Sequence, residues 1–591
     1  PFAQADLTSL ARVGNLALST AALESPADVI DAILGVRSIR TLAIPALGAE
    51  SLAVVAPIAR PGPFPVACSN VAQDFGRLQP LETASDYWRG LPRADGSPRY
   101  VTDLLAEPAD TVTYSFLVPV DDELYGRYGG RTASDVAIVC YPTTAANARA
   151  DYALPNGNVV PRMQRAGDAP ILPAGGTWPV VLYSHGYAGS PLDGTYLGAM
   201  LTLASFGYVT VAPFHGDLRW SLVGFEAIFE EGITAVGLWR DYVAMQAIRP
   251  NSAKSLLDAL SALPHWNGSL DLARVGGFGI SQGGETLMLL GGAALTTTVF
   301  QDAKPVLHDP RVAAAVGYIP FFGLSWLPSF GEDQSGVEGV TLPYLAIAGA
   351  DDPLAKLERT EQAVRLLGGT RSLVAIEGLK HDLEPAHPDD IYTWSLVFLD
   401  SQLRRDVAAT AKLQRMTSVA GGAADERRID YTAPLSAAGD ERIVVEFHHA
   451  GFDHYFVTAN PDEIAGLDTG AGGWARTGLA FKAIDAASAA ELPNCRFFGI
   501  FGSVSTHFYT INADECATVM ADPAWTFENY AFRAAMPAAE DCPADRMRVV
   551  RVFNQFKGGA LNHRYTTSAS EAASLAGEGW VVEGAVFCTP P

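Results

Sequence analysis

The sequence predicts two modules: an α/β module built on a mostly parallel sheet, and a β-rich module made of three repeats. Between residues 178 and 376, unbroken apolar runs alternate with helix-like stretches, which is typical of parallel strands buried on both faces. Beyond residue 443, one pattern of aromatic residues, histidine and glutamate occurs three times. A chain of 591 residues is also too long for one hydrophobic core, so several domains are expected.

We expect the α/β module to span residues 1–416, with an N-terminal extension at 1–100 and helices at 217–262 that would form a cap. Residues 417–442 are rich in alanine, glycine and charge, and they are predicted to be a linker. Residues 443–591 are predicted to form the β-rich repeat domain, for which a trefoil-like arrangement is one candidate.

Local patterns predict the elements of the first module in order. Two β-rich runs, residues 111–118 and 135–141, are expected to be early strands. The buried strands are expected at residues 179–184, 208–213, 275–280, 312–319, 344–348 and 372–376. Helices are expected at residues 196–206, within 223–262, and over about 390–416, where a long amphipathic helix closes the module.

Charge and hydropathy exclude several classes of partner. The net charge of −24 argues against binding to a nucleic-acid backbone or an anionic membrane surface, because both require a basic face. Hydrophobic residues make up 48% and charged residues 18%, which is typical of a folded chain. Because the sequence contains no run of 18 apolar residues, no membrane span is expected.

The six cysteines predict disulfides and an oxidising compartment. None lies in a C-x-x-C spacing. We expect Cys68 to be bonded to Cys140, and among three connectivities for the other four we favour Cys516–Cys542 with Cys495–Cys588. The chain begins at Pro1, which fits either a secreted or periplasmic protein whose signal peptide has been removed or a trimmed chain.

The candidate chemistry begins at Gly279-Ile-Ser281-Gln-Gly283, which fits the G-x-S-x-G nucleophile elbow. The apolar run before it and the helix-like run after it predict strand, sharp turn and helix. Glycine at both flanks removes the Cβ atoms where strand and helix pass close together. Because the pattern also arises by chance in glycine-rich loops, Ser281 needs partners elsewhere in the chain.

A base, an acid and oxyanion donors each have a candidate at the end of a predicted strand. Asp351 and Asp352 follow the strand that ends at residue 348, and His381 follows the strand that ends at residue 376. The main-chain N–H groups of Gln282 and Tyr187 are the expected oxyanion donors.

Two further histidines come after predicted strands: His185 directly precedes the loop residues Gly186 and Tyr187, and His215 follows the next strand. We expect His185 to brace the loop rather than to bind a metal or act as a base, and the same caution applies to His215.

These motifs together resemble the α/β-hydrolase superfamily. The resemblance covers about residues 110–415 and is closest to the branch of platelet-activating-factor acetylhydrolases, dienelactone hydrolases and cutinase-like polyesterases. It implies that Ser281 is the nucleophile and His381 the base, and the G-x-x-D turn that starts at Gly349 favours Asp352 over Asp351. Gln282 departs from the residues usual after the nucleophile in those families, so the substrate class does not transfer.

The three C-terminal blocks begin their shared pattern at His454, His507 and His563. In each block, tryptophan precedes phenylalanine by seven residues, and histidine precedes glutamate by eight or nine. The blocks resemble a repeat of unknown function that is appended to secreted bacterial hydrolases. The matched aromatic and histidine side chains are either a repeating core or three shallow sites for a glycan or an insoluble polymer.

We therefore expect a secreted serine carboxylic-ester hydrolase that acts through an acyl-enzyme without metal or cofactor. The appended repeats make a polyester or another extended, insoluble ester a candidate substrate. A serine peptidase on the same fold, or a small-ester or lipid esterase with a purely structural C-terminal domain, are the alternatives. Phe321, Phe322 and Trp326 either border the acyl pocket or pack as a core segment or lid.

Overall fold

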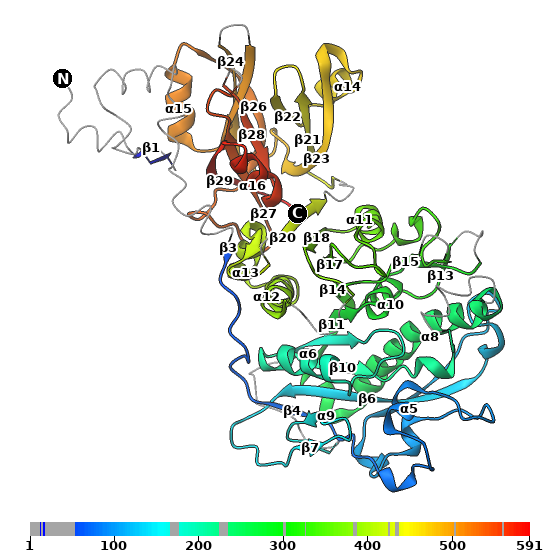
Figure 1. The fold of residues 1–591 in the computed structure, drawn as a ribbon. Coiled ribbons are helices and arrows are strands. Elements are labelled where there is room, and N and C mark those ends of the chain that lie inside the picture. Colours follow the sequence, from blue (N-terminus) through cyan, green and yellow to red (C-terminus); the bar gives the residue numbers. More distant parts are fainter. Residues whose placement is uncertain are drawn as a thin grey trace. The chain divides into compact units, whose positions relative to one another are not determined.

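The computed structural model is shown in Figure 1. It describes two short strands, β1 (Arg12–Val13) and β2 (Leu16–Ala17), and residues 54–165, 177–223, 235–298, 303–324, 327–381, 387–423, 426–431, 437–501, 504–557 and 561–591. The chain divides into two compact units. One comprises residues 57–404 with 422–426, and the other comprises residues 405–421 and 427–591 together with the chain before residue 57.

A mixed sheet forms the centre of the first unit. Six neighbouring strands run parallel, in the order β18-β17-β14-β11-β9-β10, and β6, β4 and β5 add antiparallel pairs beyond β10. Their bounds are β4 Val66–Cys68, β5 Thr113–Leu117, β6 Thr132–Pro142, β9 Trp178–Ser184, β10 Val209–Pro213, β11 Leu270–Ile280, β14 Val312–Tyr318, β17 Tyr344–Gly349 and β18 Arg371–Ile376. The parallel strands are almost entirely buried, as their apolar runs predict. The predicted α/β class with a mostly parallel sheet is confirmed.

Helices cover this sheet. The main ones are α6 Gly194–Ser205, α8 Ala235–Ala262, α10 Gln282–Leu290, α11 Leu357–Leu366 and α12 Pro388–Leu399. Helix α8 packs against α10, β5 and β10, and its side chains from Tyr242 to Ile248 are buried. In its described part it is therefore a layer of the core, and the cap expected within residues 217–262 stays a prediction.

Short elements complete the first unit. They are η1 Phe75–Arg77, α5 Ala84–Arg89, η2 Val101–Asp103, η3 Pro108–Asp110, η4 Gly126–Tyr128, η5 Asp217–Arg219, α9 Pro264–Asn267 and η6 Ser335–Val337, with the hairpin pairs β7 Tyr152–Ala153 and β8 Val159–Val160, β12 Ala294–Thr296 and β13 Ala303–Pro305, and β15 Gly323–Leu324 and β16 Leu327–Pro328.

The long helix predicted at residues 390–416 is broken. A π-helical turn, η7 (Asp400–Arg404), follows α12, and Arg405 has a positive φ of 54°. Such a backbone conformation ends a right-handed helix. A new helix, α13 (Val407–Arg415), then begins in the second unit, where Gln414 donates to the Arg546 carbonyl and accepts from the Arg548 N–H. The division into units falls before α13 and again at residues 421/422 and 426/427, which lie within the expected linker.

Two short strands and one longer strand lie near this division. Strands β3 (Val54–Val55) and β19 (Ser418–Val419) pair in parallel, and β20 (Glu426–Tyr431) lies within the expected linker. Residues 417–442 thus contain ordered strands as well as loop.

Three similar ββαβ repeats follow. The first is β21 Glu441–His449, β22 His454–Thr458, α14 Pro461–Asp468, η8 Ala471–Gly473 and β23 Trp474–Ile484; the second is β24 Leu492–Phe501, β25 Val504–Thr510, α15 Ala513–Ala521 and β26 Trp525–Ala534; the third is β27 Met547–Phe553, β28 His563–Thr566, α16 Ala569–Gly577 and β29 Val581–Thr589. In each repeat the first strand lies between the other two, and all pairs are antiparallel. Each repeat also contains a helix, which the prediction of a β-rich, trefoil-like domain did not include.

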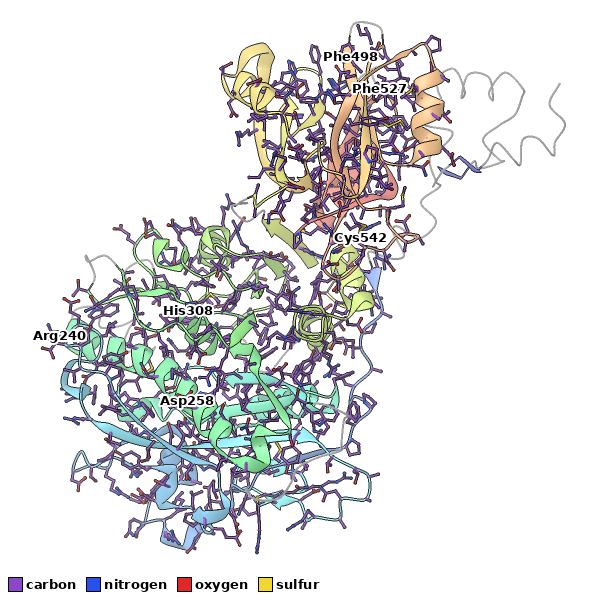
Figure 2. The ribbon with its side chains drawn as sticks, turned by 180° about the vertical axis from the view of Figure 1, so that it is seen from behind. Arg240, Asp258, His308, Phe498, Phe527 and Cys542 are labelled. Carbon is purple, nitrogen blue, oxygen red and sulfur yellow. A yellow bond between two sulfur atoms is a disulfide. The ribbon has the colours of Figure 1, made fainter. Side chains whose placement is uncertain are left out.

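The repeats share one aromatic core. Phe481, Phe532 and Phe587, the seventh residue after each repeat tryptophan, contact one another with ring centroids 5.6 to 6.1 Å apart. Figure 2 shows the side chains that fill each unit and marks Phe498 and Phe527 in the second repeat. The repeating-core interpretation of these phenylalanines is therefore supported by their burial.

All six cysteines are disulfide-bonded. The predicted bond between Cys68 and Cys140 is confirmed, and it joins neighbouring strands β4 and β6. The other predicted pairs are wrong. Cys495 is bonded to Cys516 and Cys542 to Cys588, because Cys516 on α15 lies over its own repeat's strand β24, and Cys542 precedes the strand β27 that pairs with Cys588. Among the described residues, no helix is long and apolar enough to cross a membrane.

Candidate active site

Ser281 lies in the sharp turn between β11 and α10, where it is the N-cap residue of the helix. Its φ of 52° and ψ of −115° are rarely adopted by a residue with a side chain. A Cβ on Gly279 would overlap the backbone of Gly283, and a Cβ on Gly283 would overlap the Ser184 carbonyl. Both glycines are therefore required for the turn that presents Ser281 at the carboxyl end of β11.

His381 lies between Ser281 and Asp352. The Nε2 atom of His381 is 3.0 Å from Ser281 Oγ, and its Nδ1 atom is 2.7 Å from Asp352 Oδ2. The other carboxylate oxygen of Asp352 accepts the N–H groups of Leu354 and Ala355, each at 2.8 Å. With the proton on Nδ1, the carboxylate orients the imidazole and Nε2 is able to accept a proton from the serine hydroxyl.

The two adjacent acids have different partners. Asp351 is exposed, and its carboxylate accepts the N–H of Gly378 at 3.1 Å. Gly378 has a φ of 75° and begins the turn that leads to His381. Asp352 is 5% exposed and is the acid that reaches the imidazole. Asp351 thus stabilises the backbone of the loop that carries His381, whereas Asp352 orients the His381 ring.

The predicted oxyanion donors border the same serine. Gln282 is the first residue of α10, so its N–H has no acceptor within the helix. The loop after β9 passes beside Ser281, because a Cβ on Gly186 would lie 3.7 Å from the Ser281 Cβ. Tyr187 follows in this loop, and its hydroxyl donates to the Ser221 carbonyl at 3.1 Å.

A buried ion pair holds this loop in place. Arg249 of α8 donates from Nε to Asp217 Oδ1 at 3.0 Å, and the two side chains are 1% and 0% exposed. Arg249 Nη2 also donates to the His185 carbonyl at 2.7 Å, while Asp217 Oδ2 accepts the Ala188 N–H at 2.8 Å. The pair therefore binds the main chain of this loop before Tyr187, at His185, and after it, at Ala188.

His185 and His215 support the loop, in agreement with their predicted bracing role. Burial lowers the pKa of His185 to about 4, so the ring is neutral at pH 7. Its Nδ1 atom lies 2.8 Å from the Gly186 carbonyl oxygen and 3.2 Å from Arg249 Nη2, and its Nε2 atom lies 2.9 Å from the Phe214 carbonyl oxygen. His215 Nε2 lies 3.0 Å from Ser184 Oγ.

A second polar cluster lies under the elbow. Tyr242 donates its hydroxyl to Gln282 Oε1 at 2.9 Å, and Gln246 donates to Glu285 Oε1 at 2.6 Å. Burial raises the pKa of Glu285 to about 8, so this carboxyl is mainly uncharged at pH 7. The first turn of α10 is thus fixed to α8 by side-chain hydrogen bonds.

Two of the predicted acyl-pocket residues, Phe321 and Phe322, are described and both are buried. The N–H of Phe321 donates to the Ser281 carbonyl at 3.1 Å. Phe322 is 1% exposed, and its ring packs against Phe330 and Tyr344. Phe322 is therefore part of the core. Trp326 lies outside the described residues.

Comparisons with known proteins concern only the second unit. Residues 443–589 match a family described as "Domain of unknown function (DUF5648)". This match agrees with the C-terminal repeat of unknown function expected from the sequence. No curated protein matches the chain.

Sequence reasoning missed Asp217 and Arg249, the pair that holds the loop beside Ser281. Neither belongs to a recognisable motif, and they lie 32 residues apart. The one available signal is an arginine that follows the mostly apolar run 242–248, directly before Pro250. No group of three or more His, Cys, Asp or Glu side chains in the described ranges has a geometry suited to a metal ion.

Proposed function

We propose that the first unit is a serine carboxylic-ester hydrolase. The observation that carries this proposal is the hydrogen-bonded chain from Ser281 Oγ through His381 to Asp352, at 3.0 and 2.7 Å. Three side chains from separate loops meet in the order that nucleophilic catalysis needs. The strained backbone of Ser281 and the loop beside it give further support.

In the proposed mechanism, Ser281 Oγ attacks the ester carbonyl while His381 Nε2 takes the hydroxyl proton. Asp352 stabilises the resulting imidazolium. The N–H groups of Gln282 and Tyr187 donate to the oxyanion of the tetrahedral intermediate. This intermediate collapses to the acyl-enzyme, and the departing alkoxide receives the proton from His381. Water, deprotonated by His381, then releases the carboxylic acid and restores the serine hydroxyl.

The neighbouring acids provide a matched test. Soluble p-nitrophenyl esters of rising acyl length should be hydrolysed by the wild type, and Ser281→Ala should lose at least about 10³-fold in kcat. Asp352→Asn should also lose a large factor, whereas Asp351→Asn, one residue away, should retain most activity. Equal losses for the two asparagine variants, or activity in Ser281→Ala, would contradict the proposed roles. Cleavage of amide substrates at comparable rates would instead favour a peptidase.

A polyester or another extended ester is the proposed substrate class, and it rests on the presence of an appended repeat unit. Polymer films treated with wild type and Ser281→Ala test it: soluble products should appear only with the wild type. We further propose that the protein works in an oxidising compartment outside the cytoplasm, which the three disulfides support.

A further inference from the structure

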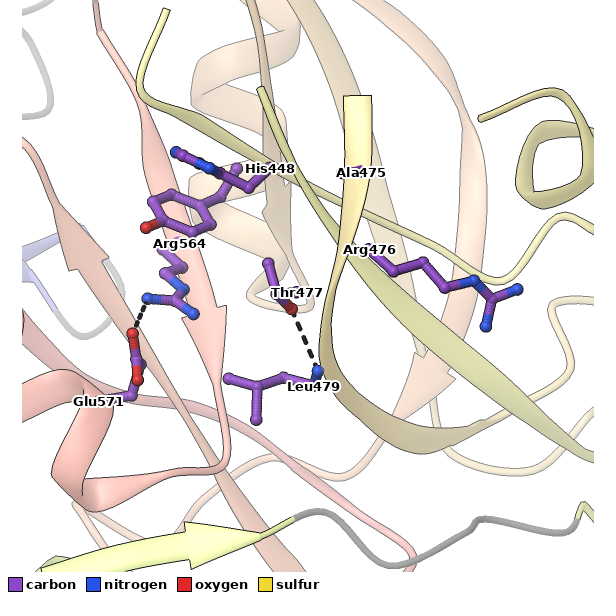
Figure 3. A pocket seen from close by; sticks show the side chains of 8 residues that line it. His448, Ala475, Arg476, Thr477, Leu479, Arg564 and Glu571 are labelled. Carbon is purple, nitrogen blue, oxygen red and sulfur yellow. Dashed lines mark hydrogen bonds and ion pairs between the residues drawn. The ribbon is translucent and has the colours of Figure 1, made fainter. Parts of the chain in front are cut away.

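A pocket of about 360 Å³ lies in the second unit, between the first and third repeats. Figure 3 shows it from close by. Its lining combines polar and apolar side chains from β21, β22, β23, β28 and α16: His448, Tyr455, Ala475, Arg476, Thr477, Leu479, Arg564 and Glu571. The three junctions between repeats differ in the side chains that fill them, and this difference explains why one of them has a pocket.

The helix N-caps set the register of the three repeats. Asn460, Asn512 and Ser568 cap α14, α15 and α16, and each accepts the N–H of the glutamate three residues later. Counting back five residues from these caps aligns Tyr455 with His507 and His563. The strand pairs agree, because these three residues lie opposite His448, Phe498 and Phe553. The sequence alignment of His454 with the other two histidines was therefore one residue out of register.

The junction between the second and third repeats is closed. Arg551 donates to Glu515 of the second repeat and to Glu583 of the third, and His563 lies 3.8 Å from Glu583. The Arg551, Glu583 and His563 side chains are at most 2% exposed. This junction is filled by its own glutamate, arginine and histidine side chains.

The junction between the first and second repeats has the same arrangement. Arg496 donates to Glu463 of the first repeat and to Glu528 of the second, and His507 lies 3.3 Å from Glu528. Glu528 and Glu583 occupy the same place, three residues after the repeat tryptophan. Each of these two junctions thus has a glutamate and a histidine at corresponding positions of the repeat.

The junction between the third and first repeats has exchanged these groups. Glu446 stands at the strand position of Arg496 and Arg551, and the arginine comes instead from Arg564, which binds Glu446 at 2.8 Å and also pairs with Glu571. The ion cluster is therefore retained. Thr477 now stands where the other junctions have glutamate, and the pocket opens beside it.

The pocket wall is suited to a ligand rich in hydroxyl groups. The Arg564 guanidinium lies 4.0 Å over the Tyr455 ring, and the His448 ring lies 4.6 Å from it on a tilted plane. These rings and Leu479 give an apolar border, while Thr477, Glu571 and the ring heteroatoms supply donors and acceptors. Both kinds of contact are needed by a sugar, which has hydroxyls and an apolar C–H face.

Charge disfavours an anionic ligand. Arg564 is shared by two carboxylates, Glu446 and Glu571, so the cluster carries an excess negative charge. Arg476 points away from the other labelled side chains in Figure 3, and Asp468 binds its guanidinium with two hydrogen bonds at 2.6 and 2.7 Å. No arginine that lines the pocket is thus left to neutralise a phosphate, sulfate or carboxylate.

We propose that this pocket, at the junction of the third and first repeats, binds a neutral sugar residue of a glycan. The protein would then have one such site, and not the three shallow sites that the sequence pattern had allowed. The proposal is independent of the catalytic roles assigned to the first unit.

The test uses the full-length protein and fills the pocket in two ways. Thr477→Glu introduces the side chain found at the other two junctions, and Leu479→Trp fills the space without changing charge. Thr526→Glu is the matched control, because it places the same substitution on an exposed site of β26 in the second repeat. Circular dichroism and thermal melting check that each variant is folded.

Binding is measured on an array of neutral oligosaccharides of the gluco, galacto, manno and N-acetylglucosamine series, followed by isothermal titration calorimetry. We expect one neutral saccharide bound per chain, at least about a tenfold loss of affinity in both pocket variants, and unchanged affinity in Thr526→Glu and Ser281→Ala. Binding of three saccharides per chain, of sulfated or uronic-acid oligosaccharides alone, or of none would overturn the proposal. So would full affinity in the folded pocket variants.

Discussion

Arg249 in the first unit and Arg551 in the second are both buried arginines paired with carboxylates, but they stabilise different things. Arg551 lies between two glutamates and joins two repeats through side chains alone. Arg249 pairs with one aspartate, donates from Nη1 to the Thr286 hydroxyl, and donates from Nη2 to the His185 carbonyl of the loop beside Ser281. A similar buried pair therefore holds a domain together in one unit and fixes the backbone of a candidate site in the other.

The largest effect is expected from Arg551→Met. Removing one partner of a buried ion cluster leaves carboxylates without compensation, which costs about 3–5 kcal/mol. Hydrogen exchange should show faster exchange throughout β24 to β29. Arg564→Met is the comparison: it also leaves the buried Glu446 unpaired, but its second partner Glu571 is 38% exposed and water can solvate it, so a smaller change is expected. Equal effects of the two variants would contradict the difference between closed and open junctions.

Arg249→Met should lower activity more than it lowers substrate affinity. If the loop loses its position, one oxyanion donor is lost, and kcat should fall by about 10²–10³ with little change in KM. Arg249→Lys keeps the charge but not the fork of donors, so it should recover only part of kcat. Arg311→Met, which breaks a partly buried arginine–aspartate pair elsewhere in the unit, is the control and should leave kcat unchanged.

Glu285→Gln should change how stability depends on pH. Burial raises the pKa of Glu285 from 4.5 to about 8, so between these values the folded state retains a proton that the unfolded chain has released. The free energy of unfolding therefore falls as pH rises across this window, by about 1.4 kcal/mol per pH unit at most. Glutamine should remove this fall. The free energy of unfolding is measured at pH 6 and pH 7 by urea titration with pulse proteolysis as the readout. If Glu285 were not the cause, it would fall by the same amount between these pH values in the wild type and in Glu285→Gln.

Arg476→Gln should have the smallest effect. Arg476 and Asp468 form an exposed pair with side chains 49% and 39% accessible, and such pairs contribute about 0.2–1 kcal/mol. A shift of the thermal midpoint beyond about 2 °C would show that exposure does not determine the strength of these arginine pairs.

The sequence predicted the strands and the order of the candidate site because both follow from local patterns. Continuous apolar runs identified all six parallel strands, and the G-x-S-x-G spacing located Ser281 in its turn. Asp351 and Asp352 follow the same strand, so their sequence positions are almost equivalent. Only the resemblance to a known turn favoured Asp352, which is the acid that reaches His381.

Features that depend on three-dimensional neighbours could not be predicted. The disulfide partner of Cys516 depends on which strand its helix covers, and no spacing records this. The first repeat has one extra residue between its histidine and its N-cap, which placed His454 out of register with His507 and His563. Arg249 of α8 and Asp217 of η5 come together only in the folded chain, so no sequence motif predicts this ion pair.

The disulfide between Cys68 and Cys140 has a consequence for aggregation. Strand β4 is the outer strand on its side of the main sheet order, and its Cys68 exchanges main-chain hydrogen bonds with Pro161 and Gln164. An outer strand that left such groups unpaired would offer them to another chain. The bond fastens β4 to its neighbour β6 at directly opposite residues. It thereby keeps this short strand on the end of β6 that β5 does not pair with, where main-chain groups of β6 would otherwise be open to another chain.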